Sequence, residues 1–364
     1  MARGTVGKNL GLTVKRLSLG VFLILLTSSV LLLSDLKQRR GGGKSGQPRI
    51  ALLQHSSQAL LDAGVQGILA ALSENGYVDG KNMVLTRYNS ENDVATGNAI
   101  AKEITDGRFD MVLTVSTLSM QAVANANKAG KAIHVFGLVA DPFVSGVGLQ
   151  RENPLAHPKH FVGIGTFMPV ADSFEMARRM FPGLSTVGVV WNVGESNSRA
   201  YTMKAREVCA QLGISLLEAN VDNSSGVMEA ASSLVGRGVQ ALWIGGDVTV
   251  LVASESLIGV ARKARIPVFT LTPPTAEKGA LFDLGANFLE VGRQTGQMAV
   301  RILQGADPST IPIVNFVPTK LIVNQQALAG LKDPWRIPED ILARADVLID
   351  ESGRKDAQRG AKSK

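Results

Sequence analysis

The sequence predicts an α/β fold of two lobes, each built on a parallel sheet. Three observations lead to this prediction. Short apolar runs alternate with segments of helical periodicity from residue 49 onward. The helical segments are about 12–18 residues long, which suits crossovers between parallel strands. The order of elements then begins again, with corresponding strands roughly 130–137 residues apart, so the chain contains two similar blocks.

The first block begins at a short apolar run, RIALLQ, which is typical of a buried strand. The next segment has apolar residues three and four positions apart and ends at Gly76, which suits a helix closed by a glycine cap. In chain order we expect strand 49–54, helix 59–76, strand 83–88, helix 94–106, strand 110–116, helix 118–129 and strand 132–138.

The second block begins at STVGVVW and repeats the alternation. Its first helix is predicted to end near Gly213, and its one cysteine, Cys209, is expected in the core. In chain order we expect strand 185–191, helix 197–212, strand 214–220, helix 224–236, strand 239–245, helix 250–264 and strand 266–271.

The two ends of the chain carry its positive charge. The formal net charge of the 364 residues is +7, of which residues 1–47 contribute +7 and residues 351–364 contribute +3. Residues 48–350 therefore carry −3. A mildly acidic body provides no attractive field for a phosphate backbone, so no nucleic-acid partner is expected. Residues 351–364 are expected to be a disordered basic tail.

Residues 17–33 form an uncharged, mostly apolar run that follows four basic residues. This pattern is typical of a secretory signal, and the run is also about long enough to span a bilayer. Both interpretations stay open: residues 1–47 are a cleaved signal or a retained anchor, followed in either case by a polar, Gly-rich tether at 34–48. Either one predicts a periplasmic or extracytoplasmic protein, anchored to the inner membrane by residues 17–33 if they are retained.

The content of cysteine and histidine argues against a metal site. A single cysteine excludes an intrachain disulfide and a Cys-based metal site. His157 and His160 are three residues apart in a polar loop, but no third ligand is near them in the sequence. We expect no metal and no cofactor.

Polar side chains follow most of the expected strands. The first block has QHSS at 54–57, STLS at 116–119 and ADP at 140–142, and the second has NVGESNS at 192–198, GGDVT at 245–249 and TLTPPT at 270–275. Open parallel sheets bind ligands beyond the carboxyl ends of their strands. The sequence therefore predicts a small-molecule site in a cleft between the two blocks.

Six stretches of the sequence carry a family resemblance. They are ALSENGYVDGKNMVLTRYNSEND (71–93), FDMVLTVSTLSMQAV (109–123), VADP (139–142), GESNS (194–198), GGDVTV (245–250) and IPEDILARADVLI (337–349). These stretches resemble the solute-binding proteins of ABC importers, in the subfamily that includes tryptophan- and phenylalanine-binding members. The similarity covers most of residues 48–350.

The resemblance implies a type I periplasmic-binding-protein fold of two Rossmann-like lobes with a three-segment hinge. The chain would cross between the lobes near 165–168, 284–288 and 314–320. Lobe 1 would then contain residues 48–165 and 286–316. Lobe 2 would contain residues 166–285 and 317–350.

The resemblance also implies solute-binding residues. In that family the turn after the second lobe's first strand resembles EANS, which corresponds here to residues 195–198. The turn after that lobe's third strand often resembles TDNT, whose aspartate pairs with an ammonium group. Here this turn is GDVT, which keeps Asp247 but has Val248 in place of the amide. The family's GT turn corresponds to Ser116 and Thr117.

A zwitterionic solute needs groups of both signs at short range. Hydroxyl and N–H groups at a helix start suit a carboxylate, and Ser116, Thr117, Asn197 and Ser198 are expected at such starts. Asp247 suits an ammonium group. From the strand ends and the resemblance together, the expected ligand-binding residues are His55, Ser56, Ser57, Ser116, Thr117, Asp141, Asn192, Glu195, Ser196, Asn197, Ser198, Asp247 and Thr270.

Helix capping and turn formation are the alternatives for these residues. Ser, Thr, Asn and Asp are ordinary N-caps and need no ligand, which applies to Thr117 and Asp247. Glu195 suits the first turn of a helix, and Asp141 precedes a proline and suits a turn. Among the aromatic residues, Phe143 and Tyr201 are candidates for apolar ligand contacts.

These patterns predict a solute-binding protein of an ABC importer. It would close about its hinge on a small solute, an amino acid or a related molecule, and act as a monomer with permease and ATPase partners. An enzyme is not expected, because the chain has no G-x-S-x-G motif and its GGGKSG stretch lacks the first glycine of a phosphate loop. A membrane-tethered ligand-sensing domain without a transport role is the alternative.

Overall fold

A computed structural model describes residue 27 and residues 46–357 of the chain. Residues 48–357 belong to one compact unit of the chain, and the following description concerns them. The expected signal or anchor at 17–33 lies outside the described residues, apart from residue 27, and so does most of the tether. Among the residues that are described, no helix is both long and apolar enough to cross a bilayer.

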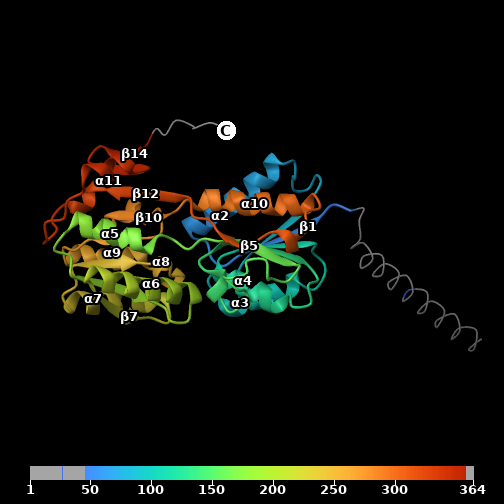
Figure 1. Ribbon diagram of the computed structural model, residues 1–364, viewed down its shortest axis with the longest axis horizontal. Coiled ribbons are helices and arrows are strands. Elements are labelled where there is room, and N and C mark those ends of the chain that lie inside the picture. Colours follow the sequence, from blue (N-terminus) through green and yellow to red (C-terminus); the bar gives the residue numbers. More distant parts are fainter. Residues whose placement is uncertain (1–26, 28–45, 358–364) are drawn as a thin grey trace, which may run out of the picture. The chain divides into compact units, whose positions relative to one another are not determined.

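The strands form two sheets, which are the centres of two lobes (Figure 1). The sheet of lobe 1 has the order β11-β5-β4-β3-β1-β2, and all its neighbouring strands are parallel. Its strands are β1 (Arg49–Gln54), β2 (Val84–Asn89), β3 (Met111–Val115), β4 (Ile133–Val139), β5 (Phe161–Gly165) and β11 (Val314–Asn315).

The sheet of lobe 2 has the order β14-β13-β12-β10-β9-β8-β6-β7. Strands β6 to β10 pair in parallel, whereas β12 is antiparallel to β10 and β14 is antiparallel to β13. Its strands are β6 (Thr186–Trp191), β7 (Ser215–Asn220), β8 (Ala241–Ile244), β9 (Val268–Thr270), β10 (Phe282–Ala286), β12 (Thr319–Asn324), β13 (Val347–Asp350) and β14 (Gly353–Asp356). The predicted α/β fold with two mainly parallel sheets is confirmed.

Helices cover both sheets. Lobe 1 has α2 (Ala59–Glu74), α3 (Val94–Ile104), α4 (Thr117–Ala126) and α10 (Phe288–Leu303). Lobe 2 has α5 (Val170–Met180), α6 (Ser196–Leu212), α7 (Val227–Gly236), α8 (Val248–Val252), α9 (Ser254–Lys263) and α11 (Glu339–Arg344). The single helix expected at 250–264 is thus two helices that meet at Ala253. Its first part begins earlier because Asp247 caps it.

The chain passes between the lobes three times. It leaves lobe 1 after β5, returns between β10 and α10, and leaves again between β11 and β12. Helix α10 lies alongside α2, the first helix of the chain's body (Figure 1). Glycines make this contact possible, because a Cβ at Gly292 would lie 2.0 Å from the carbonyl oxygen of Gly64.

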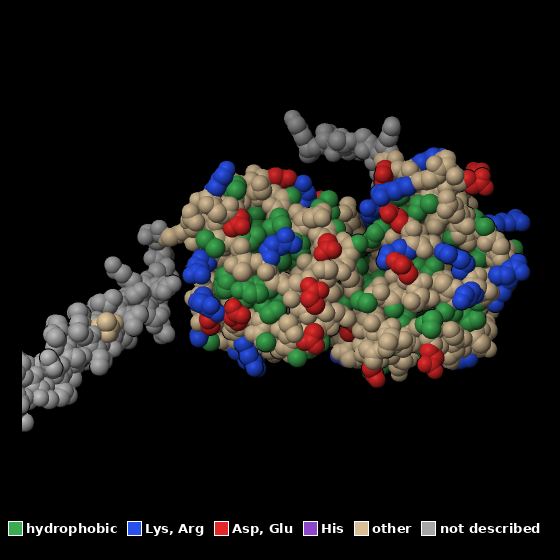
Figure 2. Space-filling model, turned by 180° about the vertical axis from the view of Figure 1, so that it is seen from behind, with side chains coloured by type: hydrophobic (Ala, Val, Ile, Leu, Met, Phe, Trp, Pro, Cys, Tyr) green, Lys and Arg blue, Asp and Glu red, His purple; other side chains and the backbone are tan. Residues whose placement is uncertain are grey.

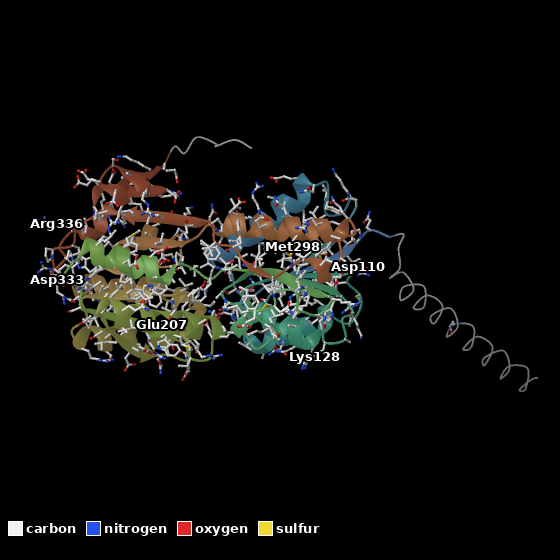
Figure 3. All side chains as sticks on the ribbon, viewed as in Figure 1. Asp110, Lys128, Glu207, Met298, Asp333 and Arg336 are labelled. Atoms are coloured by element: carbon white, nitrogen blue, oxygen red, sulfur yellow. The ribbon has the colours of Figure 1, made fainter. Side chains whose placement is uncertain are left out.

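The core is apolar and aromatic. Trp243 and Phe269 in lobe 2 are fully buried and pack against Phe174 from α5, with ring centroids 5.1 and 5.3 Å from it. Cys209 is buried, as predicted. Figure 3 labels Met298 on α10, which is only 7% exposed, and Glu207 on α6, which is exposed.

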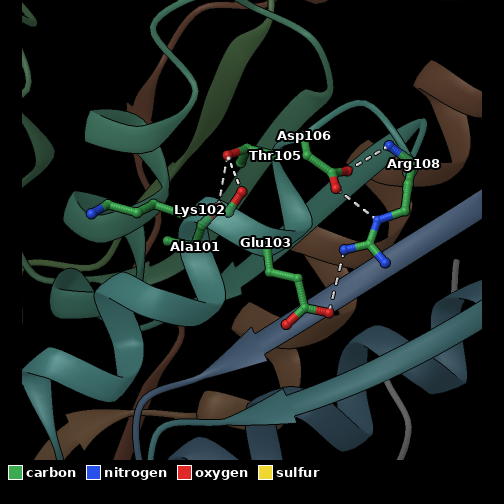
Figure 4. Close-up of polar contacts among 6 residues, drawn as sticks. All are labelled: Ala101, Lys102, Glu103, Thr105, Asp106 and Arg108. Carbon is green, nitrogen blue, oxygen red and sulfur yellow. Dashed lines mark hydrogen bonds and ion pairs between the residues drawn. The ribbon is translucent and has the colours of Figure 1, made fainter.

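Charges of both signs are mixed over the surface. Figure 2 shows Lys and Arg side chains interspersed with Asp and Glu side chains on one face of the molecule. A polar cluster of this kind lies at the end of α3. Thr105 donates a hydrogen bond to the carbonyl oxygen of Ala101 (2.7 Å), and Arg108 forms an ion pair with Asp106 (2.7 Å; Figure 4). Lys102, on the same helix, is exposed.

The expected disordered tail begins as ordered structure. Residues 353–356 form β14, which pairs with β13 and adds an edge to the sheet of lobe 2. Lys355 reinforces the pairing, because its ammonium group lies 2.7 Å from the Asp350 carboxylate. The expectation of disorder is therefore wrong for this strand. Residues 358–364 lie outside the described part of the chain.

Candidate functional site

A cavity lies between the two lobes at the carboxyl ends of their strands. Six polar side chains line it, none of them charged, and the rest of the lining is apolar or glycine. The lining residues are Leu60, Leu61, Ser116, Thr117, Leu118, Leu138, Ala140, Thr166, Met168, Asn197, Tyr201, Gly246, Val248, Leu251, Thr272 and Phe288. Larger cavities lie elsewhere, but this one is reached by the polar turns of both lobes. We call it the interlobe cavity.

The interlobe cavity is nearly filled by its own lining. Its volume is about 50 Å³, whereas ligand pockets usually measure roughly 300–1,000 Å³. The two lobes are therefore closed against each other in this structure. A solute of amino-acid size therefore needs the apolar side chains of the lining to move.

The wall from lobe 1 is the start of α4. Ser116 is its N-cap, and the Ser116 hydroxyl accepts a hydrogen bond from the backbone N–H of Ser119 (3.3 Å). Thr117 accepts one from the backbone N–H of Ala140 (3.3 Å). The first N–H groups of a helix have no acceptor within the helix, and this end is partly positive. This wall therefore suits a carboxylate.

The wall from lobe 2 presents an amide oxygen. The Asn197 amide nitrogen donates hydrogen bonds to Oε2 of Glu195 (2.9 Å) and to the carbonyl oxygen of Gly246 (2.7 Å). These two bonds determine which end of the amide is the donor. The Asn197 Oδ1 atom is buried and has no hydrogen-bond partner in the described part of the chain. This wall therefore offers an acceptor, which suits an ammonium group.

Glu195 is held at the start of α8. Its carboxylate accepts hydrogen bonds from the backbone N–H groups of Val248 and Thr249 (both 2.9 Å) and from the Thr249 hydroxyl (2.6 Å). With the bond from Asn197, the carboxylate has four donors. An anion at a helix N-terminus is stabilised by the helix dipole as well. Glu195 therefore connects α8 with the amide that faces the cavity.

Asp247 is the N-cap of the same helix. Its carboxylate accepts hydrogen bonds from the backbone N–H groups of Val250 (2.7 Å) and Asn192 (2.6 Å) and from the Ser198 hydroxyl. Burial, and next the nearby charge of Glu195, raise the pKa of Asp247 to about 7. Asp247 does not line the interlobe cavity, because both its oxygens face groups of its own lobe.

Hydrogen bonds join the lobes around the cavity. Gln58 of lobe 1 donates to the carbonyl oxygen of Val248 (3.3 Å), and Gln121 of lobe 1 donates to the Ser196 hydroxyl (3.2 Å). At the first crossing, the Tyr201 hydroxyl donates to the carbonyl oxygen of Thr166 (3.1 Å). The contacts of Gln58 and Gln121 cross between the lobes and would break if the lobes separated.

A family comparison agrees with this architecture. Residues 49–349 match the model of the ABC transporter substrate-binding proteins. The chain belongs to this family. This substrate-binding protein therefore belongs to the group of ABC transporter proteins that its sequence resembled, and it has the α/β fold that the resemblance implied.

Three relatives of the substrate-binding protein are informative. It is 27% identical over 285 residues to a tyrosine-binding protein of Clostridioides difficile, covering 78% of this chain and 81% of that one. It superposes with a TM-score of 0.77 on a domain from Streptococcus pneumoniae in complex with L-Trp, with 23% identity and coverage of 84% and 100%. It superposes with a TM-score of 0.60 on a ligand-free, open substrate-binding protein from Clostridium difficile, with 30% identity and coverage of 79% and 96%.

The remaining residues predicted in lobe 2 lie behind the cavity wall. Asn192 donates from its amide to the Thr249 hydroxyl (3.0 Å), and Ser198 donates to Asp247. Ser196 contacts Gln121 across the lobes. Thr270 is fully buried and donates to Asp283 (2.6 Å), a carboxyl group whose pKa is raised to about 7 by burial.

The remaining residues predicted in lobe 1 of the substrate-binding protein lie beside the cavity. His55 is buried, its Nδ1 lies 3.0 Å from the Ser90 hydroxyl, and its pKa is lowered, mainly by burial. Ser56 is buried, and its hydroxyl has no partner among residues 46–357, whereas Ser57 is exposed and accepts a hydrogen bond from Asn89 (2.8 Å).

The last two candidates of lobe 1 follow β4. Asp141 accepts a hydrogen bond from the backbone N–H of Phe143 (3.0 Å) and pairs with Arg151, so it forms the turn and an ion pair. Phe143 is absent from the cavity lining, but Tyr201 is part of it.

The sequence analysis missed part of the lining. Thr166 and Met168 line the cavity and lie at the first crossing between the lobes. Thr272 also lines it and follows β9, in the turn from which the sequence analysis selected only Thr270. The position of the crossing was a usable signal for the first two. The Thr166 hydroxyl is buried without a partner among the described residues. No group of three His, Cys, Asp or Glu residues that could hold a metal occurs within residues 46–357.

Proposed function

We propose that this substrate-binding protein captures an amino acid in the interlobe cavity and delivers it to an ABC importer outside the cytoplasm. The permease and the ATPase subunits would be its partners, and the solute would be released unchanged. The observation that carries the proposal is the pairing of two unlike walls. Unpartnered Asn197 Oδ1 faces the cavity from lobe 2, and the start of α4 faces it from lobe 1.

The two walls fit the two ends of an amino acid. The carboxylate would accept hydrogen bonds from the first N–H groups of α4 and from the hydroxyls of Ser116 and Thr117. The ammonium group would donate to Asn197 Oδ1 and to the Thr166 hydroxyl. Because Asn197 is bonded to the Glu195 carboxylate, its oxygen lies in a negative field that favours a cation. The side chain of the solute would pack against the leucines of the lining.

In this proposal, the other polar residues predicted from the sequence stabilise the structure around the cavity and do not contact the solute. Asp247 holds Ser198 and the turn that carries Asn197, rather than contacting the solute. His55 and Ser56 are absent from the cavity lining, and His55 contacts Ser90 of its own lobe. Thr270 supports the strand that leads to Thr272.

Closure of the hinge would trap the solute. A ligand that binds the closed state more tightly shifts the population toward it. The contacts of Gln58 and Gln121 across the lobes would form in this step. Support comes from the relatives: the fold fits the complex with L-Trp better than the open, ligand-free protein, although the latter is more similar in sequence.

Residues 17–33 would direct export of the protein. They would be cleaved after translocation or would remain in the inner membrane as an anchor. The relatives include a tyrosine-binding protein and a domain in complex with L-Trp, so aromatic amino acids are the first solutes to test.

A thermal-shift screen against the twenty amino acids tests the proposal. A ligand that binds only the folded state raises the melting temperature. We expect one amino acid or a few chemically related ones to do so, and isothermal titration should then show one site. The absence of any shift with every amino acid would count against this function.

A further inference from the structure

A second cavity lies within lobe 1, far from the interlobe cavity along the strands. It is located between the end of α4 and the beginnings of β4 and β5, and its volume is about 360 Å³. This size is within the range of small-molecule pockets. The lining residues are Ala124, Asn125, Asn127, Lys128, His134, Gly146, Val147, Pro158, His160 and Phe161. We call it the lobe 1 cavity.

The charged groups of the lobe 1 cavity have one sign. No lining residue is acidic, whereas Lys128 is a cation. Lys128 is exposed beyond the end of α4 (Figure 3), and it has no ion-pair partner within residues 46–357. The lining therefore favours an anion over a cation.

His134 provides a buried donor at the wall. Its side chain is fully buried in β4, and its Nε2 lies 2.8 Å from the Thr114 hydroxyl. Its Nδ1 has no hydrogen-bond partner in the part of the chain that the structure describes. Burial, and next the charge of His160, lower the pKa of His134 to about 3, so the ring is neutral near pH 7.

The tautomer of His134 follows from its neighbour. If the Thr114 hydroxyl donates to Nε2, the proton of the ring is on Nδ1, and a single donor is left unpartnered. If Nε2 donates instead, both the Thr114 hydroxyl hydrogen and the Nδ1 lone pair are left without partners. An unpartnered buried group costs about 1–3 kcal/mol, so the first arrangement is favoured. His134 therefore presents an N–H group from Nδ1.

The remaining walls are mainly apolar. The ring of Phe161 lies 4.9 Å from the ring of His134, measured between centroids. Gly130 has a φ of +63°, and a Cβ there would lie 2.7 Å from Nδ1 of His160, so the turn at Gly130 packs closely against that ring. The pocket therefore has mainly apolar walls, one buried N–H donor from His134 and one exposed ammonium group from Lys128.

We infer that the lobe 1 cavity binds a small organic carboxylate. A small movement of the lining exposes the Nδ1–H of His134, the carboxylate lies between this group and the Lys128 ammonium group, and its apolar body packs against Phe161 and Val147. This site is separate from the interlobe cavity, and its occupation does not depend on the solute that the importer carries.

Benzoate is a suitable probe, because it joins a carboxylate to a small apolar body. We expect its addition to the protein to shift the side-chain ¹⁵N signal of His134 Nδ1 in a histidine-selective NMR titration. Benzyl alcohol has the same body without the charge and should bind at least fivefold more weakly. A His134 signal that benzoate leaves unmoved, or equal binding of the two probes, would overturn the inference.

Matched variants locate the binding. Lys128→Gln should weaken benzoate binding at least threefold, whereas Lys102→Gln, at another exposed lysine of lobe 1, should leave it unchanged (Figure 4). Asn197→Ala should also leave it unchanged, since that residue lines the interlobe cavity. Equal loss in the two lysine variants, or loss in Asn197→Ala alone, would refute a site at His134.

Discussion

The amide nitrogen of Asn197 donates a hydrogen bond to Oε2 of Glu195 over 2.9 Å, so the amide oxygen is left for the interlobe cavity. The same carboxylate accepts two backbone N–H groups and one hydroxyl at the start of α8. One buried anion thus stabilises a helix and orients the acceptor that we assign to the solute.

Replacing Asn197 tests the acceptor. Asn197→Ala should weaken binding of the cognate amino acid at least tenfold, about 1.4 kcal/mol. The reason is that the ammonium group loses its amide acceptor and Glu195 loses a donor. Isothermal titration calorimetry measures the change. Asn98→Ala, at an exposed position of α3, is the matched control, and an equal effect of the two substitutions would remove Asn197 from the site.

Replacing Glu195 tests the link between helix and site. Glu195→Gln removes the negative charge and places an amide N–H₂ group against the hydrogen-bond donors at the start of α8. It should therefore lower the free energy of unfolding by roughly 1.5–3 kcal/mol. It should also weaken solute binding. Chemical denaturation and calorimetry measure the two effects. Glu207→Gln, in an exposed ion pair with Lys204, should change stability by less than about 1 kcal/mol. Unaltered solute affinity in Glu195→Gln would contradict the proposed field at Asn197.

The raised pKa of buried Asp283 predicts that the stability of the protein depends on pH. Burial raises its folded-state pKa from 3.8 to about 7. Between these values the folded protein keeps a proton that the unfolded chain has lost, so this residue's contribution to stability falls as pH rises from about 4 to about 7. Relative to Asp283→Asn, the wild type should therefore lose at least about 1 kcal/mol between pH 4.5 and pH 7.5, as measured by denaturation at both pH values.

Asp350 is the control for this pH effect. Hydrogen bonding, chiefly to Lys355, lowers its pKa to about 2, so it is almost fully ionised in both states from pH 5 to pH 7.5. The stability difference between wild type and Asp350→Asn should stay nearly constant from pH 5 to pH 7.5. A wild type that gained stability relative to Asp283→Asn with rising pH would show that the Asp283 pKa is not raised.

Gln121 tests the closed arrangement. Its amide nitrogen donates to the Ser196 hydroxyl across the lobes (3.2 Å) and to the carbonyl oxygen of Ser145 (2.7 Å). Gln121→Ala should favour the open state, because it removes a contact made only on closure. Small-angle X-ray scattering of the solute-free protein should then give a larger radius of gyration. Gln304→Ala, at an exposed position after α10, should leave the radius of gyration unchanged. Identical radii for the wild type and both variants would argue against the contact between Gln121 and Ser196.

The sequence was sufficient to predict the architecture, because its apolar strand runs and its helical periodicity are both strong. Alternating apolar runs and helical segments reproduce most observed elements within a few residues, and the strand-end rule placed Ser116, Thr117 and Asn197 at the cavity. It could not decide where a side chain points. Asp247 has the residue type and position of both an N-cap and a ligand contact, and only its neighbours Asn192 and Ser198 show that its oxygens face inward.

Other details depend on contacts between distant segments. The strand at 353–356 exists because it pairs with β13, and its composition of Gly, Arg, Lys and Asp gives no apolar pattern to predict it. Thr166 and Met168 reach the cavity only because the chain crosses between the lobes beside them. Neither feature has a signal in local periodicity.

Native mass spectrometry of the protein with an equimolar mixture of the twenty amino acids tests the central claim most directly. The account predicts a one-to-one adduct with one amino acid or a few related ones, which is lost in Asn197→Ala and kept in Asn98→Ala. No adduct in the wild type, or an equally abundant adduct in Asn197→Ala, would contradict the claim that the two lobes close on an amino acid held at Asn197.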